Sequence, residues 1–234
     1  MGKAFDITLV GDFIPQLIQY LGVTLQILAV SIVLGIIIGI IAAILRLFRI
    51  PILSQLVVVY VSFIRGTPIL IQLFLIFYGI PSLFQLINID LSKVDPLYSV
   101  IVAYAFNNGA VFSEIFRGAV QAVDYGQTEA AYSVGMSESQ NFFRIIVPQA
   151  VSIAFPNIAN TVISSLKDTS LAFTIGVMDM VGRGETLIAS TTHALEVYIS
   201  LSVIYYIVVV LLEKIFRWFE KRVNRHKSGE VSSV

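Results

Sequence analysis

Residues 13–45 contain no charged side chain and are apolar almost throughout. A helix needs about 20 apolar residues to cross the hydrocarbon of a bilayer, so this run is long enough to span a membrane. The whole chain has the same bias, since 57% of its residues are hydrophobic and only 13% are charged. Ordinary soluble domains carry about 25% charged residues. We therefore expect an all-α integral membrane protein.

Four further charge-poor runs predict the other spanning segments. The second run of the chain is longer than one crossing needs, so it is compatible with one long helix or with two short ones. The runs that follow the first are 50–89, 96–113, 145–166 and 197–212.

Loop charges decide how often residues 50–89 cross. Arg46 and Arg49 make the preceding loop basic, whereas the loop 90–95 has an acidic balance. Basic loops stay on the cytoplasmic side, so the two loops lie on opposite sides of the membrane. An odd number of crossings separates them, and one is the simplest. The chain is then a single domain, residues 1–234, with five transmembrane helices.

The same rule orients the bundle. The strongly basic segment 214–227 is expected in the cytoplasm, and the loop 179–185, which is not basic, is expected outside. The N-terminus is then outside and the C-terminus cytoplasmic. The first residues lack the features of a cleaved signal peptide, so the first run is expected to stay as a span. Trp218 and the basic residues near it suit an anchor in the membrane lipid interface.

The segment 124–148 lies between the third and fourth predicted spans, which places it in the cytoplasm. Thr128 or Asp124 can cap a short helix, and Gly135 stands where that helix ends in a left-handed residue. Ser137 and Gln140 have the spacing of a capping box and predict a second helix, which Pro148 is expected to interrupt. The alanines at 130 and 131 predict a narrow helix face that fits a groove in another protein, with Glu129 beside it. A plain amphipathic loop that fills space under the bundle is the alternative.

The spacing of this segment resembles the signature of ABC importer permeases, EAA-x3-G-x9-I-x-L-P, with Val in place of Leu. Three more segments extend the resemblance, which is nearest to the polar amino-acid branch and covers nearly the whole chain. They are RGTPILIQ at 65–72, EIFRGA at 114–119 and KDTSL at 167–171. Many relatives carry a carboxylate where this chain has Ser62.

The resemblance implies that a cytoplasmic ATPase binds the EAA helix and transmits its motion. The ATPase-coupling residues are then Glu129, Ala130, Ala131 and Gly135. The chain lacks the phosphate-binding sequence G-x-x-x-x-G-K-[ST], so ATP and Mg are expected in a partner subunit, and this chain has no catalytic residues. A second permease subunit and an extracytoplasmic amino-acid-binding protein are further expected partners. The implied location is the prokaryotic inner membrane, and no nucleic acid is involved.

Polar residues in the predicted spans are candidate transport residues, because they are costly in lipid. Gly66 and Pro68 break the second span beside Arg65, and irregular backbone at depth is tolerated where it lines a cavity. We expect Arg65 to hold a substrate carboxylate and Asp168 to hold its ammonium. Helix–helix hydrogen bonding is the alternative. The substrate-binding candidates are Arg65, Gly66, Thr67, Gln72, Asn160, Ser164, Lys167, Asp168 and Ser170.

Glu114 and Arg117 are three residues apart and predict an ion pair, with a gate as the alternative. Gly35 and Gly39 allow a close helix–helix approach. No metal site is expected, because the chain has no cysteine and its histidines, His193 and His226, lie far apart.

The function expected from the resemblance is transport of polar amino acids into the cytoplasm by alternating access, driven by the ATPase. A cationic substrate is left open, because Lys167 and Arg65 offset Asp168 and Glu196. The alternative is a secondary transporter driven by an ion gradient, with Asp168 or Glu114 as its proton site. A structural scaffold would leave the charges at 167 and 168 without a purpose.

Overall fold

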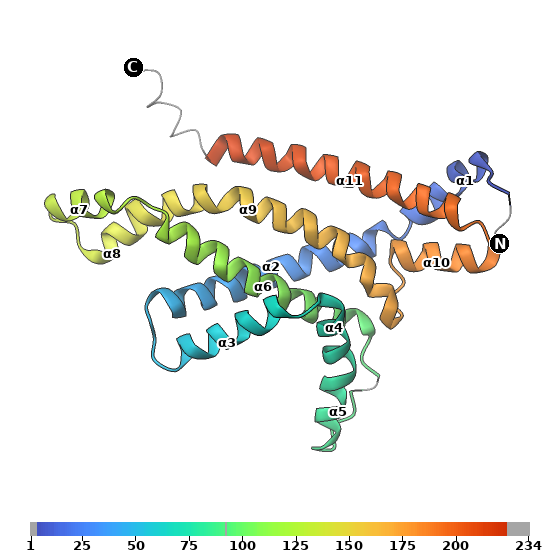
Figure 1. Ribbon diagram of the computed structural model, residues 1–234, viewed down its shortest axis with the longest axis horizontal. Helices are drawn as coiled ribbons and strands as arrows, with labels where there is room; N and C mark the ends of the chain where they lie inside the picture. The colour runs from blue at the N-terminus through green and yellow to red at the C-terminus, as the bar shows by residue number, and fades with distance from the viewer. Residues whose placement is uncertain (1–3, 92, 224–234) are drawn as a thin grey trace.

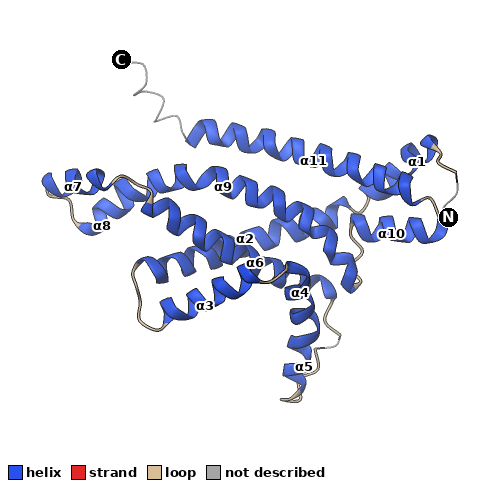
Figure 2. Cartoon of the chain, in the orientation of Figure 1, coloured by secondary structure: helices blue, strands red, loops and turns tan. Residues whose placement is uncertain are grey.

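The computed structural model describes residues 4–91 and 93–223, and within these ranges the chain is helical, without strands (Figure 2). The predicted all-α class is confirmed. His226 and the end of the basic segment lie outside the described residues. The helices are α1 (Ile7–Ile18), α2 (Leu21–Leu47), α3 (Leu53–Gly66), α4 (Ile69–Phe74), the π-helix η1 (Leu75–Gly79), α5 (Ile80–Gln85), α6 (Pro96–Gln121), α7 (Tyr125–Ser133), α8 (Glu138–Asn141), the π-helix η2 (Phe142–Ile146), α9 (Val147–Asp168), the 3-10 helix η3 (Thr169–Ile175), α10 (Met180–Thr191) and α11 (Ala194–Val223).

Four helical stretches are long and apolar enough to cross a membrane, and a bent pair makes a fifth if it counts as one span. The four are α2, α6, the continuous stretch Glu138–Ile175, and α11. The predicted break of the second span at Gly66 and Pro68 is confirmed, because α3 and the helix that begins at Ile69 are bent by 114°. Thr67 and Pro68 are extended there. Proline disfavours a helical residue before it, and this separates the two helices.

The first apolar run is also divided. The expected helix 13–45 is in the structure two helices, α1 and α2, separated by a turn at residues 19–20. α1 packs along α11, with Phe13 and Leu17 buried in a cluster that includes Val197 and Leu201. Packing against the end of the chain, which hydropathy does not reveal, therefore sets the start of the first span.

The helices α2 and α6 form the most extensive helix pair, and glycines on α2 make their approach possible. A Cβ added at Gly35 would lie 2.7 Å from the Cβ of Asn108, and one added at Gly39 would lie 2.6 Å from that of Phe112. Real side chains cannot approach that closely. The predicted close approach at these glycines is confirmed.

The two ends of the bundle hold different segments. The helices α7 and α8, the loop between α2 and α3, and the last turns of α11 lie at one end, called here the α7 end (Figure 1). The N-terminus, α1 and α10 lie at the other, while α4 and α5 project sideways. The segments expected in the cytoplasm are thus grouped together at the α7 end.

Candidate functional site

The segment 124–148 forms the helix–turn–helix that its sequence predicts. The Asp124 side chain accepts from the Gly126 N–H at 2.8 Å and caps α7. α7 ends at Ser133, and Gly135, just beyond the C-cap residue Val134, has a φ of +79°. The Met136 N–H donates to the Ala131 carbonyl and the Gly135 N–H to the Tyr132 carbonyl, a Schellman pattern. Both bonds of the Ser137–Gln140 capping box are present. The predicted caps and turn are confirmed.

The expected interruption at Pro148 is wrong. The helix continues from α8 through η2 into α9, with Pro148 in the first turn of α9. Proline has no N–H to donate, and the wider π-turn of residues 142–146 ends two residues before Pro148. A π-turn lets the helix continue although Pro148 has no backbone N–H to donate. Such turns are frequent at functional sites. The helix that begins at Glu138 therefore continues into α9 without a break.

α7 is almost wholly exposed. Glu129 and Ala130 are exposed, and Ala131, which is 5% exposed, is its one buried residue. Adjacent helical residues point about 100° apart, so the expectation that both alanines share one outer face is wrong: Ala130 is outward and Ala131 packs inward. α7 also exposes Tyr125, which is 72% exposed, and its C-cap residue Val134 is 77% exposed. The Glu129 carboxylate forms no ion pair with a described residue.

A cluster of charges joins α2, α3 and α6. Glu114 forms ion pairs with Arg46, from the end of α2, and with Arg117 at 2.7 Å. Arg65 Nη1, at the end of α3, lies 4.0 Å from Glu114 Oε2. The predicted pair of Glu114 and Arg117 is thus confirmed as part of a larger cluster. Arg46 is a site residue that sequence analysis used only to orient a loop, and its signal was its position beside an apolar run.

An open cavity of about 460 Å³ lies beside this cluster. Ser62, Arg65, Gly66 and Glu114 line it together with Arg46. Asp168, the expected partner of Arg65, is not among its lining residues. The structure therefore brings Arg65 to the carboxylate of Glu114.

Gln72 closes the break between α3 and α4. Its amide nitrogen donates to the carbonyls of Ile64 and Thr67 at 2.7 and 2.9 Å, and it lies 3.1 Å from Thr67 Oγ1. Asn107 of α6 donates to the Gln72 oxygen at 3.0 Å. Gln72 is 3% exposed. It satisfies backbone groups freed by the break, a contact that the sequence does not predict.

The polar residues of α9 lie mostly on an outer face. Asn157, Asn160, Ser164 and Lys167 are exposed, and Asp168 and Ser170 are partly buried. Asn160 lines a separate cavity of about 210 Å³ beside the last turns of α11. The buried neighbour Ser165 donates to Asn108 Oδ1 of α6 at 2.6 Å, a helix–helix bond that sequence analysis missed. This chain thus leaves an exposed polar stripe on a membrane helix.

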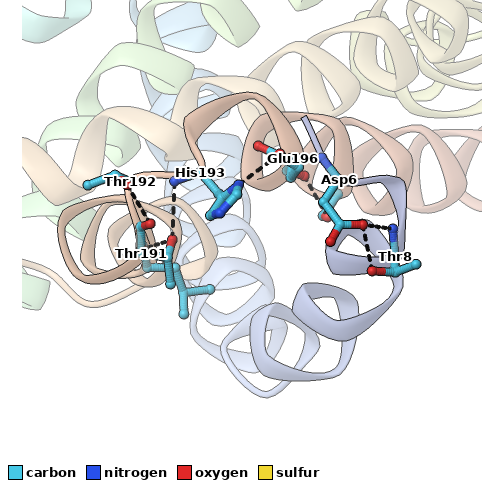
Figure 3. Close-up of polar contacts among 8 residues, drawn as sticks. Asp6, Thr8, Thr191, Thr192, His193 and Glu196 are labelled. Carbon is cyan, nitrogen blue, oxygen red and sulfur yellow. Dashed lines mark hydrogen bonds and ion pairs between the residues drawn. The ribbon is translucent and has the colours of Figure 1, made fainter. Parts of the chain in front are cut away.

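Polar contacts also fasten the other end of the bundle (Figure 3). Glu196 Oε1 accepts from the Asp6 N–H at 2.9 Å and lies 2.9 Å from His193 Nδ1. The Thr8 hydroxyl and amide donate to Asp6, which lowers the pKa of the Asp6 carboxyl. At the start of α10, Asp179 caps the helix and is fully buried, and burial raises its pKa to about 6. The described residues hold no cluster suited to a metal ion.

Comparison with known proteins identifies the family. The family model described as "Binding-protein-dependent transport system inner membrane component" matches residues 35–225. The chain belongs to this family. The permease is 58% identical over 232 residues to the L-cystine transport system permease protein TcyL of Bacillus subtilis, covering 99% of this chain and 97% of that protein. It is 34% identical to the glutamine transport system permease protein GlnP of Escherichia coli, covering 94% and 98%.

Solved structures agree with this assignment. The permease superposes with a TM-score of 0.84 and 29% identity on a chain of "an amino acid ABC transporter with histidines", covering 94% of this chain and 100% of that one. An inward-facing MetNI methionine ABC transporter gives a TM-score of 0.73 at 18% identity, covering 88% and 95%, a likeness of fold. The predicted permease family and the multi-pass location in the inner membrane are confirmed.

Proposed function

We propose that this permease is the translocating subunit of an ATP-driven importer of polar amino acids. The proposed topology has five crossings, with the bent pair of α3 and the helix from Ile69 as one of them. The N-terminus is outside, and the α7 end is in the cytoplasm. An ATPase subunit binds α7, and an extracytoplasmic binding protein delivers the substrate at the opposite end.

The exposure of α7 is the observation that carries this proposal. A helix of nine residues with one buried residue gains little from its own chain, because helix stability in proteins comes chiefly from tertiary packing. Its ends are capped, while Glu129 and the apolar side chains of Tyr125 and Val134 are exposed. This surface suits a partner with an apolar groove and a cation. The continuous path through η2 would carry motion of α7 into α9.

The exposed polar stripe of α9 supports a second permease subunit. Polar residues in membrane helices face a bundle interior or an aqueous cavity. In the single chain both Lys167 and Asn160 are exposed, and Asn160 lines the small cavity beside α11. A second copy or a related subunit would cover the stripe and complete the pathway. Alternating access would then be a shift between two arrangements of these subunits.

The charged cavity is the proposed contact for the substrate backbone. Arg65 supplies a guanidinium for a carboxylate, and Glu114 supplies an acceptor for an ammonium. Arg46 and Arg117 already balance Glu114, and Ser62 adds no charge, so the cavity has no carboxylate left for a cationic side chain. We therefore favour a zwitterionic amino acid without a net charge. The relatives named for L-cystine and glutamine make these the substrates to test first.

The ion-gradient alternative loses its support here, because the family is described as part of binding-protein-dependent systems. Reconstitution tests the proposal. The permease with its co-purified ATPase and binding protein is placed in liposomes, and uptake of labelled cystine is measured with and without ATP. We expect uptake only with ATP. Uptake by the permease alone under a proton or sodium gradient would contradict the proposal.

A variant of α7 tests its proposed coupling role separately. Glu129→Arg reverses the exposed charge of the signature, and we expect loss of ATPase binding and of uptake, with unchanged thermal stability. Glu138→Arg changes an exposed carboxylate of the same loop at a variable position of the signature. It is the matched control and should keep both. Equal uptake by the parent and Glu129→Arg would show that α7 is not the coupling contact.

A further inference from the structure

An apolar cavity of about 290 Å³ lies between α2, α6, η2 and α9 near the α7 end. All fourteen side chains that line it are hydrophobic. Its floor is made of small buried residues, including Ala43, Ala119, Ala150 and Ala154, which are 2–6% exposed. The rim carries larger, exposed ones, with Phe143 at 67% and Val151 at 49%. The small floor and bulky rim leave a recess on the surface of the membrane helices.

The chemistry of the lining limits what can fill this recess. A polar ligand would lose its hydrogen bonds there without replacement, and apolar cavities of this kind do not hold water. An empty recess would forfeit dispersion contacts along its walls. The cavity lies between segments that cross the bilayer, so a hydrocarbon chain can enter it from the side.

Two cations flank the cavity. The ring of Phe48 meets that of Phe142 edge-on at 5.8 Å, which places the α2–α3 loop, and with it Arg49, beside η2. Arg144 is on η2 itself. Both arginines are exposed, and neither forms an ion pair with a described residue. The site thus combines an apolar recess with a positive rim at the end of the spanning helices.

We propose that this recess binds an anionic phospholipid, with an acyl chain against the alanine floor and the headgroup phosphate at Arg49 and Arg144. Arginine binds phosphate with its planar guanidinium, and basic sites between membrane helices bind anionic headgroups. A second copy of the chain fits less well. A symmetric contact on this face would bring the same arginines together, whereas a phosphate neutralises them. The lipid would lie directly against η2.

Lipid-specific quenching tests the proposal on the full-length permease in the assembly with which it co-purifies. Trp218, the single native tryptophan, is replaced by Phe, and Phe143→Trp introduces a reporter at the rim. Acyl-brominated phosphatidylglycerol and phosphatidylcholine are then compared as quenchers in mixed vesicles. We expect phosphatidylglycerol to be favoured by about threefold or more, because only its headgroup carries the net negative charge that the two arginines attract.

Matched variants separate this site from general lipid contact. Val33→Trp, at a position of α2 that is 57% exposed and outside the cavity, should show no preference between the two lipids. Arg49→Gln with Arg144→Gln should bring the ratio at the Phe143→Trp reporter to about one. Val151→Phe should fill the recess and weaken quenching by both lipids, whereas Val33→Phe should not.

Three outcomes would overturn the proposal. Equal quenching at the two reporter positions means that only the general lipid shell covers the recess. A preference that persists without both arginines means that the headgroup is not bound there. Absence of quenching, with cross-linking of two copies through position 143, means that a second copy covers the cavity.

Discussion

The Asn107 amide donates to the Gln72 side-chain oxygen at 3.0 Å, while Gln72 donates to the carbonyls of Ile64 and Thr67 across the helix break. One side chain thus ties the end of α3, the start of α4 and the middle of α6 together. The break beside Arg65 is held by a specific contact, so the charged cavity has a fixed wall.

Gln72→Leu should destabilise the permease. The substitution leaves two carbonyls at the break without their donor, and an unsatisfied buried polar group costs about 1–3 kcal/mol. We expect a lower apparent Tm in detergent. Gln85→Leu, at an exposed position of α5, is the control and should leave the Tm unchanged. Equal Tm values for both variants would show that the break does not depend on Gln72.

Glu114→Gln should destabilise the junction of α2, α3 and α6, because it leaves Arg46, Arg65 and Arg117 without their counter-charge. Removing one partner of a buried pair costs about 3–5 kcal/mol, and less is expected here because the Glu114 side chain is 20% exposed. Glu213→Gln breaks an exposed pair with Arg217 and should cost under about 1 kcal/mol.

A double-mutant cycle measures how much of this loss belongs to one pair. Arg46→Met combined with Glu114→Gln should destabilise less than the sum of the two single variants, since residues in contact are coupled. Chemical unfolding in detergent gives the four stabilities. Strict additivity would mean that Arg46 and Glu114 do not interact in the folded protein.

The stability of the permease should depend on the protonation of Asp179. Burial raises the pKa of this carboxyl from 3.8 to about 6 in the folded state. The folded protein therefore holds the proton more tightly than the unfolded chain, and the contribution of Asp179 to stability falls as pH rises from about 4 to about 6. Above that range the cost is constant, at about 2–3 kcal/mol.

Asp179→Asn should abolish this dependence, because the amide carries no charge and still caps α10. The variant should gain stability over the parent at pH 7.5 and match it at pH 4, as measured by unfolding at both values. Asp124→Asn, at an exposed cap, should show no such gain. A variant less stable than the parent at pH 7.5 would show that the carboxylate is stabilising.

Gly39→Ala should push α2 away from α6, since the added Cβ would lie 2.6 Å from the Phe112 Cβ and 3.1 Å from the Ser113 nitrogen. Overpacking of this kind costs about 1–3 kcal/mol. Gly22→Ala, on the same helix with nothing within 4 Å of the new Cβ, should be neutral or stabilising. Unfolding of both variants in detergent compares them directly, and equal stability would contradict the close approach.

The sequence predicted the features that local chemistry determines. The caps and glycine turn of residues 124–140 depend on neighbours a few positions apart, so their spacing was sufficient. The break after Gly66 followed from Pro68, and the family followed from the EAA spacing. The angle of the break could not be predicted from the sequence. It is held by the contact of Gln72 with α6, which joins residues distant in sequence.

The contacts missed from the sequence all involve partners far along the chain. Arg46 was assigned to a loop, yet its partner Glu114 lies 68 residues away. α1 was merged with the first span because hydropathy does not register a turn between two apolar helices. The inward position of Ala131 follows from packing under α7. In each case tertiary contact decided what periodicity left open.

The hydrogen bond from the Asp6 N–H to the Glu196 carboxylate joins residues 190 positions apart. α1 leaves the ribosome before α10 and α11, but these two helices supply the surface against which Phe13 and Leu17 pack. Until α10 and α11 have been synthesised, α1 lacks this docking surface in the nascent chain. A permease truncated before residue 194 would lose the α11 side of this surface and the hydrogen bond from Asp6 to Glu196.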